Sequence, residues 1–239
     1  MEQAKQRIEL MDAARGLSLI LMVFYHFFYD LVVFAGAPRW IFRNVVFDPL
    51  QYFFAGLFIL ISGVSSNFSH SNALRGLKTL GVALVITLAT TLMDMPIVFG
   101  ILHFLGTCML LYGLTQRFWQ TLGEKASWAV PALCLAGIVL TARFANGYPT
   151  ETPYLWMFGL VTPAFESADY FPLLPWMFVF LLGTWAGKYV RERRLPKWFY
   201  ETKVPFLPAV GRSSLLIYVL HQPVLYGLTM LGIWIFGKG

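Results

Sequence analysis

The sequence contains few charged residues for its length. Asp, Glu, Lys and Arg make up 13% of the 239 residues, whereas a typical soluble domain has about 25%. Hydrophobic residues account for 58% of the chain, and its mean hydropathy is +0.64. This deficit of charge excludes an ordinary water-soluble domain and predicts that most of the chain lies in a bilayer.

Cysteine is equally scarce. The two cysteines, Cys108 and Cys134, both lie within apolar runs. Their number and spacing fit neither a disulfide framework nor a metal site. We interpret them as small buried hydrophobic residues and predict that the protein binds no metal.

The sequence also lacks internal repeats, low-complexity tracts and long linkers, so we expect a single domain over residues 1–239. It does contain apolar runs of about 15 to 26 residues, close to the about 20 that cross a bilayer as a helix. We therefore predict an all-α integral membrane fold, a bundle of about seven transmembrane helices. The predicted spans are residues 13–36, 48–67, 74–94, 96–115, 127–145, 170–189 and 211–236.

The first apolar run and residues 152–165 lead to different predictions. The first run is too long for the core of a signal peptide, so we expect it to remain as a spanning helix. Residues 152–165 are apolar too, but they are short and interrupted by Pro153 and Pro163. We expect this segment to lie on the extracytoplasmic side, as an interfacial or re-entrant piece.

The basic residues predict the orientation. The formal net charge is +6, and 14 of the 18 Lys and Arg residues lie on the inner side if the N-terminus is cytoplasmic. Such a bias predicts a cytoplasmic N-terminus and an extracytoplasmic C-terminus. It also accounts for the positive charge without a nucleic-acid partner.

Three histidines lie deep within predicted spans. At 1.5 Å per residue, His26 lies about 16 Å above Arg15, His221 about 13 Å above Arg212, and His103 about 10 Å below the outer end of its span. All three therefore fall in the middle third of a hydrocarbon core of about 30 Å. Titratable groups at this depth usually face the bundle interior and have a function. The alternative is that the histidines are structural; for His221 it is a histidine bonded to a neighbouring backbone carbonyl.

A carboxylate accompanies the first histidine. Asp30 follows His26 by four residues, which places both on one face of a helix. The carboxylate could orient the imidazole and stabilise its charged form, as in a catalytic His–Asp pair. The alternative is an Asp at the outer helix end that caps the helix or meets water.

Basic residues on the inner side are candidates for binding phosphates. Asp12 and Arg15 are three residues apart on one helical face, and Arg15 is suited to phosphate groups that enter from the cytoplasm. Arg191, Arg193 and Arg194 could serve the same ligand. The alternatives are a surface ion pair of little energy for Asp12 and Arg15, and the positive-inside rule alone for the arginine cluster.

Residues 15–26, which begin with Arg15 and end with His26, resemble the Arg-x10-His signature of transmembrane acyltransferases. The chain also resembles the heparan-alpha-glucosaminide N-acetyltransferase catalytic-domain family in its small bacterial form. The stretches that carry this resemblance are residues 11–23, 58–63, 101–106 and 211–223.

The resemblance implies transfer of an acetyl group from cytoplasmic acetyl-CoA to a sugar or glycolipid acceptor on the other side of the membrane. It makes Arg15 and His26 the motif residues. His221 and Tyr218 match the Tyr-x-x-His pattern of the last span. In the animal lysosomal enzyme the proposed catalytic histidine lies in the first lumenal loop, but residues 37–47 here contain no histidine. We therefore place the chemistry on His26.

The expected mechanism uses a neutral imidazole, which takes a proton from the acceptor as it attacks the thioester. Tyr218 or a second histidine would donate to the oxyanion. The expected location is a bacterial inner membrane, with membrane lipids as further partners and a homodimer left open. The alternatives are a proton-coupled transporter and a non-catalytic membrane protein with structural histidines. The lack of an inverted repeat argues against a transporter.

Overall fold

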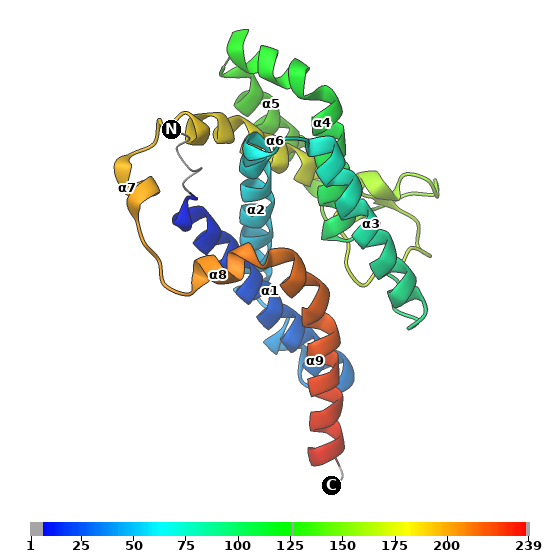
Figure 1. The fold of residues 1–239 in the computed structure, drawn as a ribbon. Coiled ribbons are helices and arrows are strands. Elements are labelled where there is room, and N and C mark those ends of the chain that lie inside the picture. The colour runs from blue at the N-terminus through cyan, green and yellow to red at the C-terminus, as the bar shows by residue number, and fades with distance from the viewer. Residues whose placement is uncertain (1–6, 126, 238–239) are drawn as a thin grey trace. The chain divides into compact units, whose positions relative to one another are not determined.

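The computed structural model describes residues 7–125 and 127–237 and is mostly helical (Figure 1). Long apolar runs form helices because a helix satisfies its own backbone hydrogen bonds, which lipid cannot do. The chain divides into two compact units: unit 1 comprises Met1–Phe58 and Leu195–Gly239, and unit 2 comprises Ile59–Arg194. Helix α2 (Phe47–Ser65) runs from one into the other, and the single domain expected for the chain stays a prediction.

Unit 1 is built on the first and last long helices of the chain. Its elements are α1 (Glu9–Phe34), η1 (Arg39–Ile41), the first part of α2, α7 (Lys197–Glu201), α8 (Leu207–Arg212) and α9 (Ser214–Phe236). Helix α1 ends before Gly36, whose φ of 69° needs a residue without a side chain. Pro38 follows two residues later and favours extended backbone before it.

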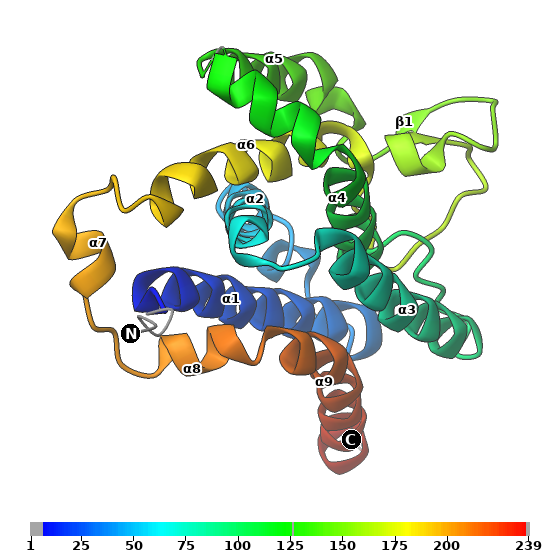
Figure 2. The same ribbon diagram turned by 45° about the horizontal axis from the view of Figure 1, so that its top comes forward.

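Helices α1 and α8 lie side by side and cross at two glycines (Figure 2). A Cβ atom at Gly16 would lie 2.2 Å from the carbonyl oxygen of Leu207, and one at Gly211 would lie 1.9 Å from that of Asp12. Only glycine permits this approach of the two backbones. The crossing places the start of α9 next to α1.

Unit 2 contains the remaining helices and a short extended segment. Its elements are the end of α2, η2 (Ser66–Phe68), α3 (Asn72–Thr91), α4 (Ile101–Lys125), α5 (Ala129–Thr141), η3 (Ala142–Phe144), β1 (Tyr148–Pro149), η4 (Trp156–Phe158), β2 (Leu160–Val161) and α6 (Leu173–Arg191). Strands β1 and β2 pair in parallel, with Tyr148 opposite Leu160. Helix α3 packs against α4, and α5 packs against α6.

Glycines also set the closest helix contacts of unit 2. A Cβ at Gly63 on α2 would lie 2.1 Å from the Phe180 carbonyl oxygen, and one at Gly183 on α6 would lie 2.1 Å from that of Leu60. The small residues at the end of α2 therefore serve helix packing. The side chain of Asn67 donates to the carbonyl of Thr184 at 2.8 Å and continues this contact.

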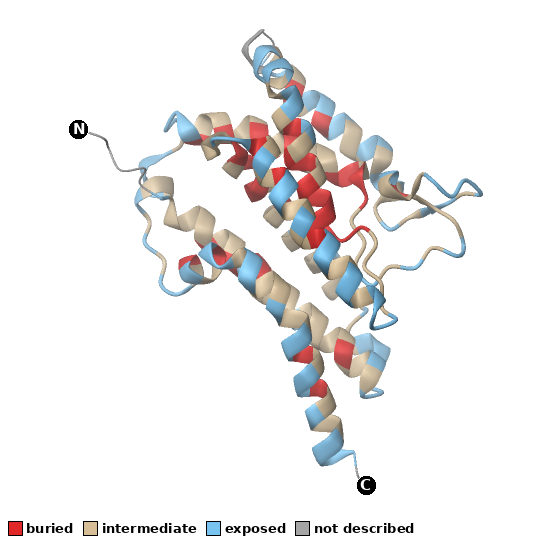
Figure 3. Ribbon diagram, turned by 45° about the vertical axis from the view of Figure 1, so that its right-hand side comes forward, coloured by how far each residue is buried: buried red, intermediate tan, exposed pale blue. Residues whose placement is uncertain are grey.

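Most of the buried side chains lie in unit 2 (Figure 3). Phe104 on α4 and Phe180 on α6 are both fully buried. Cys108 and Cys134 are buried and free, which confirms the interpretation of both as small hydrophobic residues. Helix α9 instead exposes a large apolar surface, as a helix that contacts lipid does. Its exposed residues are Leu215, Leu216, Leu220, Val224, Leu228, Leu231, Trp234, Ile235 and Phe236.

The structure confirms a mostly helical fold that contains candidate membrane-spanning helices. Five helices of the described chain are long and apolar enough to cross a bilayer: Glu9–Phe34, Phe47–Phe68, Asn72–Thr91, Leu173–Arg191 and Ser214–Phe236. The predicted fourth and fifth spans are helical as α4 and α5. Helix α4 becomes polar beyond its buried first turns, and α5 has only 13 residues. Seven spans, with the cytoplasmic N-terminus and extracytoplasmic C-terminus, stay a prediction.

Several predicted boundaries are wrong. Helix α4 begins at Ile101, not at residue 96, because residues 96–100 are not helical: the amide of Val98 donates to the Ser167 side chain, and Phe99 forms a β-bridge with Tyr170. It then continues to Lys125, well past the predicted end. Helix α6 begins at Leu173 instead of residue 170. As expected, residues 152–165 form no spanning helix.

Candidate functional site

His26 lies in the middle of α1 with its ring fixed by the backbone. Its Nδ1 atom lies 2.9 Å from the carbonyl oxygen of Met22, one turn earlier. A carbonyl oxygen only accepts hydrogen bonds, so Nδ1 carries the proton and donates it. In the neutral ring the lone pair is then on Nε2. The backbone of α1 thus selects the tautomer in which Nε2 can take a proton.

His221 on α9 lies against the same imidazole. The centroids of the His26 and His221 rings are 4.8 Å apart, and the rings meet edge to face at 79°. Nδ1 of His221 lies 2.7 Å from the Tyr218 carbonyl oxygen, so it is also the donor. Two of the three histidines expected at mid-bilayer depth are therefore brought together, with the same tautomer fixed in each.

Tyr218 lies next to this pair. Its ring centroid is 5.5 Å from that of His221. On the other side, the ring of Tyr25 meets His26 edge to face at 5.8 Å. Aromatic rings therefore flank both imidazoles and keep apolar surface around them.

Asp30 has a different partner from the expected one. Its carboxylate oxygen Oδ1 accepts a hydrogen bond from Nε2 of Gln222 at 2.8 Å, whereas Nδ1 of His26 donates to Met22. The His26–Asp30 pairing is therefore wrong as regards Nδ1, because side chains on a helix lean toward its N-terminus, where the carbonyl of Met22 lies. Asp30 is fully buried, and its Oδ2 has no hydrogen-bond partner in the described chain.

Sequence reasoning missed Gln222. It follows His221 directly and is a polar residue inside an apolar run, which was the available signal. Its bond to Asp30 joins α9 to α1 one helical turn away from His26. This bond and the histidine contact together fix the register of the two helices.

His103 belongs to unit 2, on α4. Its Nε2 lies 3.0 Å from the hydroxyl oxygen of Thr87. That hydroxyl donates its one proton to the Ile97 carbonyl oxygen at 2.5 Å, so it accepts from His103. The imidazole thus links α3 to α4 as a structural hydrogen-bond donor. A catalytic role for His103 stays a prediction.

Asp12 and Arg15 form the ion pair that their spacing suggests. Nη1 of Arg15 lies 3.3 Å from Oδ1 of Asp12, and both side chains are mostly buried, with 18% and 15% exposed. The pair lies at the crossing of α1 and α8, since Asp12 also provides the carbonyl that faces Gly211. Phosphate binding by these two residues stays a prediction.

The arginine cluster at the end of α6 is exposed. Arg191, Arg193 and Arg194 all lie on the surface. Arg194 pairs with Glu192 at 2.8 Å and lies over the ring of Tyr189, with its guanidinium carbon 5.7 Å from the ring centroid. Exposed pairs contribute little to stability. A role for the cluster in binding the donor stays a prediction.

No group of three or more His, Cys, Asp and Glu side chains that could hold a metal ion occurs in the described residues. Unit 1 brings together imidazole, carboxylate and phenol groups. Within apolar helices, these groups are typical of a membrane protein whose half-buried histidines can transfer protons.

Comparison with known proteins identifies the family. The family model described as "Heparan-alpha-glucosaminide N-acetyltransferase, catalytic" matches residues 7–223. The chain therefore belongs to this family and is an acetyltransferase of the membrane, as the resemblance of its sequence suggested. No curated protein and no solved structure matches the chain.

Proposed function

We propose that this protein transfers the acetyl group of cytoplasmic acetyl-CoA to a sugar or glycan acceptor on the extracytoplasmic side of the membrane, with His26 as the general base. The observation that carries this proposal is the fixed tautomer of His26 beside His221. A general base needs an accessible lone pair in a defined direction, and the bond to Met22 directs that of His26 to Nε2. The family match supports acetyl transfer as the reaction.

The proposed reaction is a direct transfer. The acceptor hydroxyl or amine attacks the thioester carbonyl while Nε2 of His26 takes its proton. The tetrahedral intermediate then collapses, the carbon–sulfur bond breaks, and the imidazolium returns the proton to the departing thiolate. The products are the acetylated acceptor and coenzyme A, and the ring of His26 is neutral again.

The developing oxyanion needs a hydrogen-bond donor. A neutral His221 cannot provide one, because its only N–H donates to the Tyr218 carbonyl. We therefore assign this role to the hydroxyl of Tyr218. Asp30, held by Gln222, would stabilise the positive charge that forms on the imidazole pair.

The donor side of the proposal rests on the basic residues. Arg15, paired with Asp12 at the α1–α8 crossing, is proposed as one candidate to bind a phosphate of acetyl-CoA. Arg191, Arg193 and Arg194 at the end of α6 are proposed as separate candidates for the same ligand. The orientation predicted from the Lys and Arg bias places all of them on the cytoplasmic side. A bacterial inner membrane is the proposed location.

Replacement of His26 tests the proposal. In H26N the amide nitrogen can still donate to the Met22 carbonyl, but the base is gone, so the fold should persist. The purified protein is incubated with labelled acetyl-CoA and an extract of lipids and glycans, and the label on the acceptor is measured. We expect a loss of about 10²- to 10⁴-fold in rate, the usual contribution of a general base.

The matched control is F24A. Phe24 is on the same helix, two residues away, and is 53% exposed. This variant should keep the rate of the wild type. Wild-type rates in H26N, with an unchanged elution volume and melting temperature, would remove His26 from the mechanism. A wild-type protein that labels no acceptor but moves protons across vesicles would favour the transporter.

A further inference from the structure

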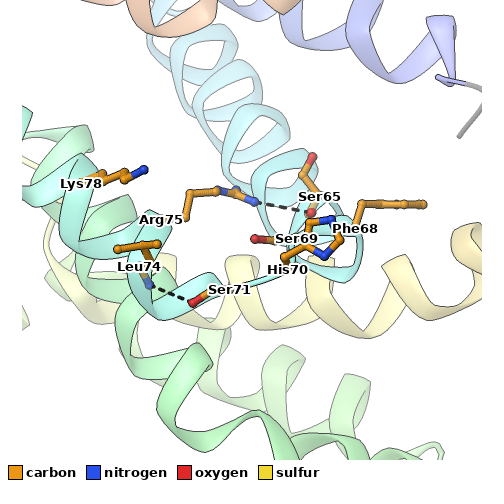
Figure 4. Close-up of a pocket in the computed structure, with 8 residues that line it drawn as sticks. All are labelled: Ser65, Phe68, Ser69, His70, Ser71, Leu74, Arg75 and Lys78. Atoms are coloured by element: carbon orange, nitrogen blue, oxygen red, sulfur yellow. Dashed lines mark hydrogen bonds between the residues drawn. The ribbon is translucent and has the colours of Figure 1, made fainter.

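A cavity lies where α2 ends and α3 begins (Figure 4). Its volume is about 410 Å³ and it opens to the outside. This volume falls within the range of about 300–1,000 Å³ that is usual for small-molecule sites. The residues that line it are Ser65, Phe68, Ser69, His70, Ser71, Leu74, Arg75 and Lys78.

The lining is cationic. Arg75 and Lys78 lie three residues apart on the first turns of α3, so they share one face of the helix. None of the eight described residues that line the cavity is acidic. The positive end of the α3 dipole is at the same place, because the helix begins at Asn72. The ionised side chains of the lining are thus all positive.

Hydrogen bonds within the protein also preorganise part of the cavity lining. Nη1 of Arg75 donates to the carbonyl of Ser65 on α2 at 3.5 Å, which directs the guanidinium across the cavity. Ser71 caps α3 by accepting from the amide of Leu74 at 3.2 Å. The hydroxyl groups of Ser69 and Ser71 add donors of the kind that bind phosphate oxygens, whereas Ser65 donates its hydroxyl proton to the carbonyl of Ile61 at 2.8 Å.

Apolar side chains complete the lining. Phe68 and Leu74 both line the cavity; in Figure 4 Leu74 lies beside Arg75 and Lys78, whereas the ring of Phe68 points away from them. The cationic groups can pair with phosphates. Anionic lipid headgroups also bind basic pockets at a membrane surface. The lining alone therefore selects phosphate groups, and binding measurements separate a nucleotide from a headgroup.

We propose that this cavity binds phosphate groups, and that the phosphorylated nucleotide end of coenzyme A supplies them. The second half of this inference rests on the proposed function, which makes acetyl-CoA the donor. The loop that lines the cavity connects two candidate spans, Phe47–Phe68 and Asn72–Thr91. A loop between two spanning helices lies at a membrane surface. The predicted orientation makes this surface cytoplasmic, where the coenzyme is available.

The test measures binding of adenosine 3′,5′-bisphosphate to the purified full-length protein by calorimetry, with adenosine and inorganic phosphate as comparison ligands. In R75Q/K78Q the affinity for the bisphosphate should fall about tenfold or more, since each lost bond to a charged group is a large contribution. The matched control is R117Q, which removes a charge from an exposed position on α4. It should bind as the wild type does.

Further measurements distinguish a nucleotide from a lipid headgroup as the source of the phosphate. K78Q alone changes an exposed side chain and should weaken binding about threefold without affecting the fold. Equal affinity in R75Q/K78Q and the wild type, or no binding to the wild type, would overturn the inference. So would a double variant that alters only the response to phosphatidylglycerol in nanodiscs, because a lipid would then be the ligand.

The acetyl-transfer assay distinguishes the inference from the proposed function. An unchanged KM for acetyl-CoA in an active R75Q/K78Q enzyme would overturn the coenzyme assignment and leave acetyl transfer intact. Bisphosphate binding that depends on Arg75 and Lys78, in a protein that transfers no acetyl group, would support the phosphate site and remove the proposed function.

Discussion

The crossing of α1 and α8 makes Gly211 the position where one added carbon should have the largest effect. In G211A the new Cβ would lie 1.9 Å from the Asp12 carbonyl oxygen. Carbon contacts are comfortable at about 3.5 Å, so the two helices must separate by more than about 1 Å. The backbone fixes the positions of both the new Cβ atom and the carbonyl oxygen, so neither atom can rotate away.

The cost can be estimated from two opposing terms. Overpacking of this kind costs up to about 3 kcal/mol. Alanine in place of glycine regains about 1 kcal/mol within a helix. The expected net destabilisation is therefore about 2 kcal/mol. Because α9 begins two residues after α8 ends, the shift also moves His221, and a misplacement of about 1 Å can reduce the rate about 10²-fold.

Thermal unfolding in detergent and the acetyl-transfer assay measure these two effects. The matched control is G227A on α9, where an added Cβ has no neighbour within 4 Å. This variant should be as stable as the wild type or slightly more stable. If G211A unfolds at the same temperature as G227A and retains its activity, the close crossing and its role in placing α9 are refuted.

Two further variants test hydrogen bonds between helices. T87V removes the acceptor for His103 and should destabilise the protein by about 1–3 kcal/mol, since a buried donor is left unpaired; a wild-type melting temperature would contradict the structural role of His103. Q222L removes the donor to Asp30 and should cost a similar amount, about 1–3 kcal/mol, whereas Q222N, with a shorter side chain of the same chemistry, should recover part of it. Equal stability of Q222L and the wild type would show that the bond between α1 and α9 is unimportant.

Most of the secondary structure could be predicted from the sequence because it depends on short-range interactions. An apolar run in lipid must bond its own backbone, so the long helices follow from composition alone. The depth of His26 and the spacing of Asp12 and Arg15 follow from the helical rise and repeat. The family resemblance was likewise available in residues 11–23, 58–63, 101–106 and 211–223 and is confirmed by the match over residues 7–223.

Only the tertiary structure decided which of these residues meet. His26 and His221 are far apart in the chain, and so are Asp30 and Gln222, which form the bond that sequence reasoning missed. Such contacts depend on how each helix is rotated and where helices cross, which the packing of many side chains determines together. Asp30 follows His26 by four residues on α1, as the sequence shows, yet its carboxylate accepts a hydrogen bond from Gln222 on α9. A local pattern fixes the face of a helix, whereas the partner of that face is a property of the whole fold.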